Sequence, residues 1–308
     1  MKAVLLFPGQ GAQKVGMGKD FYDAYPAAHE MMDAADAALG TPLTKVMFEG
    51  PDAELTRTCH CQPALFLHGL VIWNLLREAV EIEPVAAAGL SLGEFTAHAA
   101  AGTFSMEDGL KLVQKRGAYM EEACAAAPST MAAMIGGNDE AVQALATECG
   151  IDVANYNCPG QTVVSGSVEG VDKAVAGARA AGFKLAKKLN VAGAYHSRFM
   201  KSAQEKLLPE LQSVPMQMPA CPVYCNYAGR PVESTDDIRA MLGAQVCGSV
   251  RWAASMQDLI AKGHRLFIEM GPGKTLAGMM GRICKEATVI SIEDVATLQA
   301  AIETLKSL

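Results

Sequence analysis

The chain has 308 residues, and half of them are hydrophobic, which is enough for a large buried core and favours two domains. Its 33 acidic residues outnumber its 26 basic residues and leave a net charge of −7. A net negative charge disfavours binding to the phosphate backbone of nucleic acids, so we expect no nucleic-acid partner. The N-terminal apolar stretch is too brief for a signal peptide, and no segment reaches about 18 uninterrupted apolar residues. We therefore expect a cytoplasmic protein without a membrane span.

Nine cysteines are spread along the chain without a repeating spacing. An odd number in this pattern argues against a disulfide framework and is typical of a reducing compartment. Two segments, 59–61 and 221–225, bring a cysteine close to a histidine or to a second cysteine, and zinc uses such ligands. Neither segment has a C-x-x-C pair followed by a partner pair, so we expect no metal site.

The chain opens with a predicted buried strand at 2–7, followed by a glycine-rich loop. This loop does not fit a dinucleotide site, because Lys14 stands where the third glycine of that fingerprint belongs. The later sequence GPGKT at 271–275 lacks the first glycine of a phosphate-binding loop, since Ile268 occupies its position. We interpret GPGKT as a turn from a strand into a helix.

Apolar periodicity predicts the next elements, which are helices at 20–39 and 62–79, a strand at 84–89, and helices at 92–102 and 105–123. Ser105 and Asp108 form a capping-box pattern at the start of the last of these helices.

The segment 130–192 has the element order β-α-β-β-α-β, which is that of a ferredoxin-like unit. The predicted strands are 130–136, 151–157, 161–166 and 183–191, and the predicted helices are 138–150 and 168–182. After this segment the chain returns to alternating helices and strands. We expect an α/β fold with a large domain formed by 1–125 and 193–308, interrupted by an α+β domain at 126–192.

Ser91 is the strongest candidate for a catalytic group. It stands in Gly89-Leu90-Ser91-Leu92-Gly93, between a predicted strand and a predicted helix. G-x-S-x-G in this setting is a nucleophile elbow, in which the glycines permit a sharp turn that lifts the serine hydroxyl above the edge of the sheet. The sequence therefore predicts a serine nucleophile.

A serine hydroxyl needs a base, and one of six histidines should lie at the same edge of the sheet. Four are interpreted as structural: His29 and His68 in amphipathic helices, His60 beside cysteines, and His98 about 10 Å along the helix from Ser91. His264 precedes a strand and falls at the opposite edge. His196 follows a predicted strand and precedes a helix, so we choose it as the base.

Arg116 lies in the middle of the apolar face of the predicted helix 105–123. A guanidinium that points inward must find an anion, because an unpaired buried charge is very costly. Two interpretations stay open, an internal Asp or Glu partner and a substrate carboxylate bound bidentately. With a serine nucleophile, the second one predicts acyl transfer from a dicarboxylic thioester.

These residues stand in stretches that resemble the malonyl-CoA:acyl carrier protein transacylases of fatty-acid synthesis and the acyltransferase domains of polyketide synthases. The matching stretches run nearly end to end: LFPGQGAQ (6–13), QPALF (62–66), GLSLGEFTAHAAAG (89–102), QKRG (114–117), VANYNCPGQTVVSG (153–166), GAYHS (193–197), QVCGSVRW (245–252) and FIEMGPGKTL (267–276).

The resemblance implies a hydrolase-like α/β domain with a ferredoxin-like insertion, and a ping-pong reaction through an acyl-serine on Ser91 with His196 as its partner. It further implies that Arg116 binds the free malonyl carboxylate. The remaining implied site residues are Gln10 and Leu92, whose backbone N–H groups form the oxyanion hole, Gln245, whose carbonyl orients the histidine, and Met120, Tyr195 and Asn155, which bind substrate. The implied partners are malonyl-CoA and an acyl carrier protein with its phosphopantetheine, and no bound cofactor or metal is implied.

Three positions depart from the commoner family pattern, namely Leu90, Ala12 and Tyr195. None of them removes a catalytic group, and the bulky ring of Tyr195 still favours malonyl over a branched acyl group. Basic residues gather in sequence around His196, and we expect Lys187, Lys188 and Arg198 to steer an acidic carrier protein, with a solvated surface as the alternative.

Two other functions use the same residues. A serine thioesterase or esterase would let water replace the carrier thiol, and a non-catalytic carrier-binding subunit would keep the fold alone. Arg116 and the orientation of the histidine by Gln245 argue against the hydrolase, and the intact set of Ser91, His196 and Arg116 argues against the inactive subunit. A free-standing chain of this length favours fatty-acid over polyketide synthesis.

Overall fold

The computed structural model describes all residues from Met1 to Leu308, which divide into two compact units. The first unit comprises Met1–Gly117, Val214–Tyr224 and Leu259–Leu308, and the second comprises Ala118–Ser213 and Cys225–Asp258. The segment 126–192 contains the whole antiparallel sheet described below, but the second unit also takes in chain on both sides of that segment. The predicted boundaries therefore enclose the sheet and not the full compact unit.

A six-stranded sheet has the strand order β10-β9-β1-β2-β7-β8. Its strands are β1 (Lys2–Phe7), β2 (Glu83–Gly89), β7 (Val223–Cys225), β8 (Arg230–Pro231), β9 (Leu266–Met270) and β10 (Thr288–Ile292). The pairs β1–β2, β1–β9, β9–β10 and β2–β7 are all parallel. Five of the six residues of β1 are buried, as expected for a strand in the middle of a parallel sheet that is covered on both faces.

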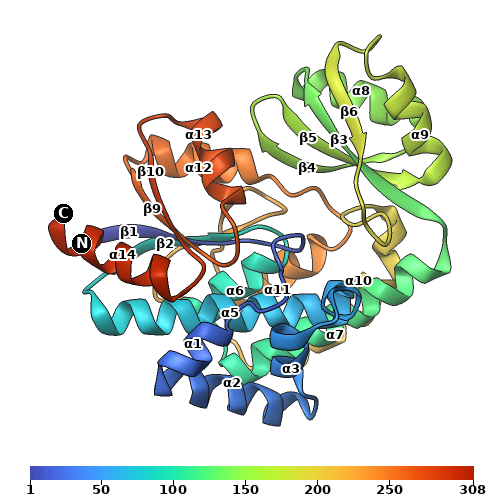
Figure 1. Ribbon diagram of the computed structural model, residues 1–308. Coiled ribbons are helices and arrows are strands. Elements are labelled where there is room, and N and C mark those ends of the chain that lie inside the picture. Colours follow the sequence, from blue (N-terminus) through green and yellow to red (C-terminus); the bar gives the residue numbers. More distant parts are fainter. The chain divides into compact units, whose positions relative to one another are not determined.

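The first unit also contains helices, of which α5 and α6 lie below the sheet in the view of Figure 1. The helices of this unit are α1 (Lys19–Ala24), α2 (Pro26–Leu39), α3 (Leu43–Glu49), α4 (Asp52–Thr56), α5 (Thr58–Ala79), α6 (Leu92–Ala100), α7 (Met106–Ala126), α13 (Thr275–Ile283) and α14 (Val295–Ser307), and α7 continues past Gly117 into the second unit. The helix predicted at 20–39 is two helices, because Tyr25 is extended and Pro26 starts a new helix at its first position.

The second unit contains a four-stranded antiparallel sheet of order β4-β5-β3-β6. Its elements follow the predicted order β3 (Ser129–Gly136), α8 (Asp139–Cys149), β4 (Asp152–Cys158), β5 (Gln161–Ser167), α9 (Val168–Gly177) and β6 (Phe183–Lys188). Both helices cover one face of the sheet, where residues such as Met134, Val164 and Phe183 form a buried core (Figure 1). The expected α/β fold with a ferredoxin-like unit is confirmed.

The rest of the second unit includes the end of α7, strand β8 and four helices, namely η1 (Arg198–Met200), α10 (Lys201–Ser213), α11 (Thr235–Ala244) and α12 (Trp252–Ala261), the last of which continues past Asp258. None of the helices in the chain has the length and apolar character needed to cross a membrane. All nine cysteines are free thiols.

Candidate active site

Ser91 lies in a sharp turn between β2 and α6, as the elbow pattern predicts. Its backbone angles are φ 54° and ψ −106°, which few residues with a side chain adopt. The turn is closed by hydrogen bonds from Leu90 N to Phe7 O and from Gly93 N to Leu90 O, at 3.0 and 2.9 Å. A residue in such a conformation costs about 1–3 kcal/mol and persists only where its surroundings determine it.

Close backbone contacts explain the glycines of the elbow. A β-carbon at Gly89 would lie 1.9 Å from the Gly93 carbonyl, and a β-carbon at Gly93 would lie 2.1 Å from the carbonyl oxygen of Phe7. A β-carbon at Gly9, in the glycine-rich loop after β1, would lie 2.4 Å from the Leu90 carbonyl oxygen. These glycines let β1, β2 and α6 approach closely enough to force the turn at Ser91.

Arg116 extends from α7 toward the elbow and is only 1% exposed. Its Nη2 donates to Ser91 Oγ at 3.1 Å, and its Nη1 donates to Gln62 Oε1 at 2.7 Å. The guanidinium also stacks over the ring of Phe95 at 5.1 Å. Both of these hydrogen-bond acceptors are neutral groups, and the contacts orient the guanidinium beside the serine.

Gln62 is a site residue that the sequence analysis did not single out. It is 1% exposed and lies on α5, one turn after the start of the helix. Its only signal in the sequence is its position in the QPALF stretch, because its partner Arg116 is 54 residues away. The amide oxygen fixes one arm of the guanidinium, which leaves the other arm directed at Ser91.

The two predicted oxyanion donors lie at one edge of the sheet. Phe7 and Gly89 are paired neighbours on parallel strands, and Gln10 and Leu92 each follow three residues later. Leu92 is the first residue of α6, where backbone N–H groups have no partner within the helix. A small cavity of about 150 Å³ lies against the Gln10 loop, lined by Pro8, Gly9, Gln10, Gly11, Ala12, Leu90, Thr275 and Leu276.

His196 occupies a turn of the second unit and is 4% exposed. Its Nδ1 lies 2.7 Å from the carbonyl oxygen of Gln245, which follows the last residue of α11. A carbonyl oxygen can only accept, so Nδ1 carries the proton and Nε2 presents its lone pair. His196 also has φ 54°, and it and Ser91 are the two non-glycine residues with positive φ.

The other five histidines have structural surroundings. His98 is fully buried with Nδ1 3.0 Å from Thr103 Oγ1, and burial lowers its pKa to about 3. Burial likewise lowers the pKa of His68 to about 4. His29 contacts Asp33 on the same helix, α2, and His60 at the start of α5 contacts Glu54 on α4. His264 precedes β9, at the amino edge of the sheet, as expected.

The second unit also holds the other predicted substrate residues. Met120, Asn155 and Tyr195 are 2%, 8% and 7% exposed. A cavity of about 750 Å³ in this unit is lined by His196, Arg198, Lys201, Arg251 and Cys247, among other residues. The structure thus groups Ser91, Arg116, Gln10 and Leu92 in the first unit. It groups His196, Gln245, Tyr195 and Asn155 in the second.

The three predicted docking cations differ in their charge environment. Lys188 forms an ion pair with Asp172 at 2.7 Å, and Arg198 forms a bidentate pair with Asp152, with its shortest contact at 2.6 Å. Lys187 is exposed on β6 and has no ion-pair partner. Only Lys187 therefore presents an uncompensated charge.

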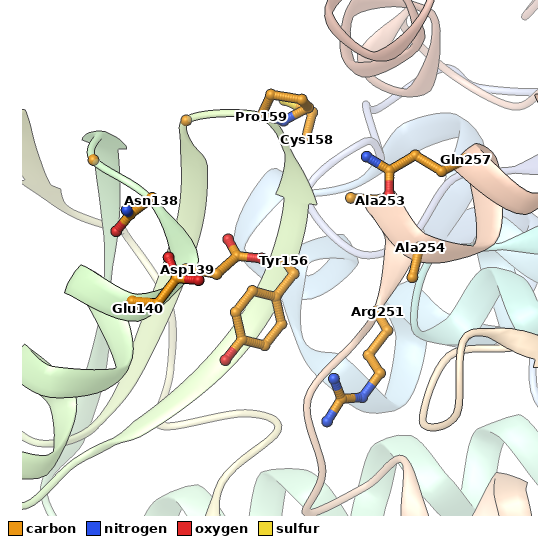
Figure 2. Close-up of a pocket in the computed structure, with 12 residues that line it drawn as sticks. Asn138, Asp139, Glu140, Tyr156, Cys158, Pro159, Arg251, Ala253, Ala254 and Gln257 are labelled. Atoms are coloured by element: carbon orange, nitrogen blue, oxygen red, sulfur yellow. The ribbon is translucent and has the colours of Figure 1, made fainter.

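Another cavity of the second unit, of about 570 Å³, contains none of the predicted site residues. Figure 2 shows it between the start of α8 at Asn138–Glu140, Tyr156 of β4 and the start of α12. The Arg251 guanidinium lies 5.9 Å from the Tyr156 ring, and Asp139 and Glu140 contribute acidic groups. Because the lining carries both basic and acidic groups, its charge does not indicate a particular class of ligand.

The phosphate-loop and zinc patterns are explained by internal contacts. The first N–H groups of α13, those of Leu276 and Ala277, donate to the buried carboxylate of Glu269 at 2.9 and 3.0 Å, where a phosphate would have to bind. The Cys61 thiol contacts Gln13, and burial raises its pKa to about 12. No three His, Cys, Asp or Glu side chains in the chain gather as metal ligands would.

Comparisons with known proteins show the family of the chain. The model of the acyl transferase domain family matches residues 4–303. The chain is 40% identical to the malonyl CoA-acyl carrier protein transacylase of Bacillus subtilis (strain 168), over 99% of this chain and 98% of that protein. It is 35% identical to the protein of that name in Escherichia coli (strain K12), over 97% and 98%.

The fold is also closely similar to that of a solved structure. The complex PlMCAT:AntF, a type II PKS acyl-carrier protein with its malonyl-transacylase, has a chain that superposes with a TM-score of 0.95 at 32% identity, covering 99% of this chain and 100% of that one. This chain therefore belongs to the acyl transferase domain family and, within it, to the group of malonyl CoA-acyl carrier protein transacylases.

Proposed function

We propose that this chain transfers a malonyl group from CoA to the phosphopantetheine thiol of an acyl carrier protein, through a malonyl ester on Ser91. The observation that carries the proposal is the buried Arg116 guanidinium, whose Nη2 lies 3.1 Å from Ser91 Oγ. A cation beside the nucleophile suits an acyl group with a second carboxylate, because a guanidinium binds carboxylate bidentately. The names of the relatives, which combine malonyl CoA with acyl carrier protein, support the same pair of substrates.

In the first half-reaction, Ser91 Oγ attacks the thioester carbonyl and gives its proton to Nε2 of His196. The hydrogen bond from Nδ1 to the Gln245 carbonyl stabilises the tautomer and the imidazolium that forms. The developing oxyanion accepts hydrogen bonds from the backbone N–H groups of Gln10 and Leu92. The C–S bond then breaks, and His196 returns the proton to the departing CoA sulfur.

In the second half-reaction, the carrier thiol gives its proton to His196 and attacks the malonyl ester, and Ser91 leaves as the alcohol. Arg116 anchors the malonyl carboxylate through both steps and fills the pocket, which protects the ester from water. Tyr195 provides a bulky ring beside the base, which favours malonyl over branched acyl groups. The reaction takes malonyl-CoA and phosphopantetheine as substrates and uses no further cofactor.

Carrier docking is proposed at Lys187, an exposed cation on β6 without an ion-pair partner, with Lys188 and Arg198 in support. An acidic carrier would gain long-range attraction from this surface, chiefly in its association rate. The insertion boundaries at 126 and 192 and the cytoplasmic location stay predictions of the sequence analysis.

The test is intact-protein mass spectrometry after mixing with malonyl-CoA and then with phosphopantetheinylated carrier protein. We expect a malonyl adduct that Ser91→Ala abolishes and that moves to the carrier. Arg116→Ala should lower malonyl transfer at least about 100-fold while acetyl transfer or hydrolysis gains, because the carboxylate loses its anchor.

Each alternative function has its own outcome. An adduct lost to water without transfer would indicate the thioesterase or esterase, and no adduct would indicate the non-catalytic subunit. Unchanged malonyl transfer in Arg116→Ala would refute the carboxylate anchor. A Lys187→Glu variant with a wild-type carrier dependence at low salt would refute the docking surface alone.

A further inference from the structure

His196 adopts a backbone conformation that regular secondary structure does not support. Residues 191–197 form neither helix nor strand, and His196 has φ 54°. Positive φ in a residue with a side chain persists only where the surroundings determine it. The contacts that stabilise this turn therefore decide where the imidazole lies.

Ser165, on β5, contacts the peptide group that precedes His196. Its hydroxyl donates to the carbonyl oxygen of Tyr195 at 2.7 Å, and its side chain is fully buried. That oxygen belongs to the planar peptide group between Tyr195 and His196, and the rotation of this group about the His196 N–Cα bond is φ. A hydrogen bond that fixes the oxygen therefore fixes the left-handed conformation of His196.

Ser165 is itself placed rigidly. It pairs with Met131 on β3 and with Asp152 on β4, so its strand has a neighbour on each side. A group on a central strand positions its partner more accurately than a group on a loop does. In contrast, the Ser197 hydroxyl, which donates to Ala194 O at 2.6 Å, lies within the turn and moves with it.

We propose that Ser165 is a positioning residue for His196. Its hydroxyl orients the backbone of the turn, the Gln245 carbonyl orients the imidazole, and the two contacts together fix the position of Nε2. The proposal rests on the assignment of His196 as the base under the proposed function. Ser165 bonds to the backbone of the turn, so it acts through His196 and not on the substrate.

The test compares Ser165→Ala with Ser167→Ala, two residues along the same strand. The Ser167 hydroxyl accepts from Gly170 N at 3.1 Å and caps α9, so its loss lowers stability by about 1 kcal/mol without touching the turn. We expect Ser165→Ala to slow malonyl-serine formation about 10–100-fold with an unchanged KM for malonyl-CoA, since a misplaced base affects the chemical step. Ser165→Cys should recover part of the rate.

A second readout does not depend on activity. Hydrogen exchange in the peptide 192–200 should accelerate in Ser165→Ala and stay at the wild-type rate in Ser167→Ala. Wild-type acylation and wild-type exchange in Ser165→Ala would overturn the proposal, as would an equal loss of rate in both variants. If the wild-type protein forms no malonyl-serine, the proposed function fails, while the exchange experiment still decides whether Ser165 holds the turn.

Discussion

Ser91 and His196 have the same unusual φ of 54°, but the two turns are stabilised in different ways. The Ser91 turn is enforced by close backbone contacts, since Gly89 and Gly93 have no room for a β-carbon. The His196 turn is stabilised by hydrogen bonds from side chains on other elements, with Ser165 on β5 as the buried example. One strained residue therefore depends on steric fit and the other on directional bonds.

This difference predicts how amino-acid substitutions would disrupt each turn. Steric fit between backbones is shared by β1, β2 and α6, so it cannot be lost without disturbing the sheet. A hydrogen bond from one hydroxyl can be lost alone, at a typical net cost of about 0.5–1.5 kcal/mol. Substitutions at the elbow should therefore affect stability and activity together, and substitutions at the histidine turn should separate them.

The largest expected effect is that of Gly93→Ala. The added β-carbon would lie 2.1 Å from Phe7 O, so β1 and α6 must separate. We expect a loss of about 3 kcal/mol or more in the free energy of unfolding, together with loss of malonyl-serine formation. Urea denaturation measures the first and mass spectrometry the second.

Gly281→Ala is the matched control for this substitution. Gly281 is exposed on α13, and a β-carbon there has no neighbour within 4 Å. Alanine should stabilise the helix by up to about 1 kcal/mol. Wild-type stability of Gly93→Ala would contradict the steric account of the elbow.

An intermediate effect is expected from acid, which should weaken the helix that follows Ser91. His98 lies on α6, and burial lowers its pKa to about 3, so the unfolded chain binds its proton more readily. The stabilisation is complete above the unfolded pKa near 6.5 and is lost progressively as the pH falls toward 3. We expect a loss of about 2 kcal/mol from this residue between pH 7 and pH 5.

The measurement is urea unfolding at pH 7 and pH 5 for the wild type and for His98→Gln. The variant should lose about 2 kcal/mol less than the wild type over this interval. Identical pH dependence in the wild type and in His98→Gln would show that His98 is not buried as a neutral group.

The smallest expected effect is that of Ser129→Ala, which removes another hydrogen bond of the histidine turn. Ser129 Oγ accepts from Ala194 N at 3.1 Å, two residues before His196. We expect a loss of about 1 kcal/mol in unfolding free energy, with the acylation rate within about 3-fold of wild type.

Ser213→Ala provides the control, because its hydroxyl contacts only the exposed end of α10 at Glu210 O. It should change neither unfolding nor acylation measurably. A loss in Ser129→Ala as large as that in Gly93→Ala would contradict the distinction between the two turns.

Much of the fold could be predicted because its signals are local. The buried run of β1, the elbow glycines around Ser91 and the inward position of Arg116 each follow from spacing within one element. The break of the first long helix was missed, although Pro26 marks it, because the apolar periodicity continues on both sides.

The partners of the site residues could not be predicted from the residues alone. Arg116 is oriented by Gln62, 54 positions away, and Tyr195 by Ser165, 30 positions away. The residues next to Gln62 and Ser165 in the sequence do not indicate that these side chains make such contacts. The sequence left an internal carboxylate and a substrate carboxylate open as partners of Arg116, and the structure adds hydrogen bonds to two neutral groups, Gln62 and Ser91.

The sequence by itself predicted most of the helices and strands and the sharp turn at Ser91, because periodicity and the elbow glycines act over a few neighbouring residues. The tertiary structure alone decided how the two strained residues are supported. The packing of β1 against α6 and the reach of Ser165 to the peptide before His196 join segments far apart in the chain. Such contacts exist only once the chain has folded, since folding is what brings those segments within hydrogen-bond distance.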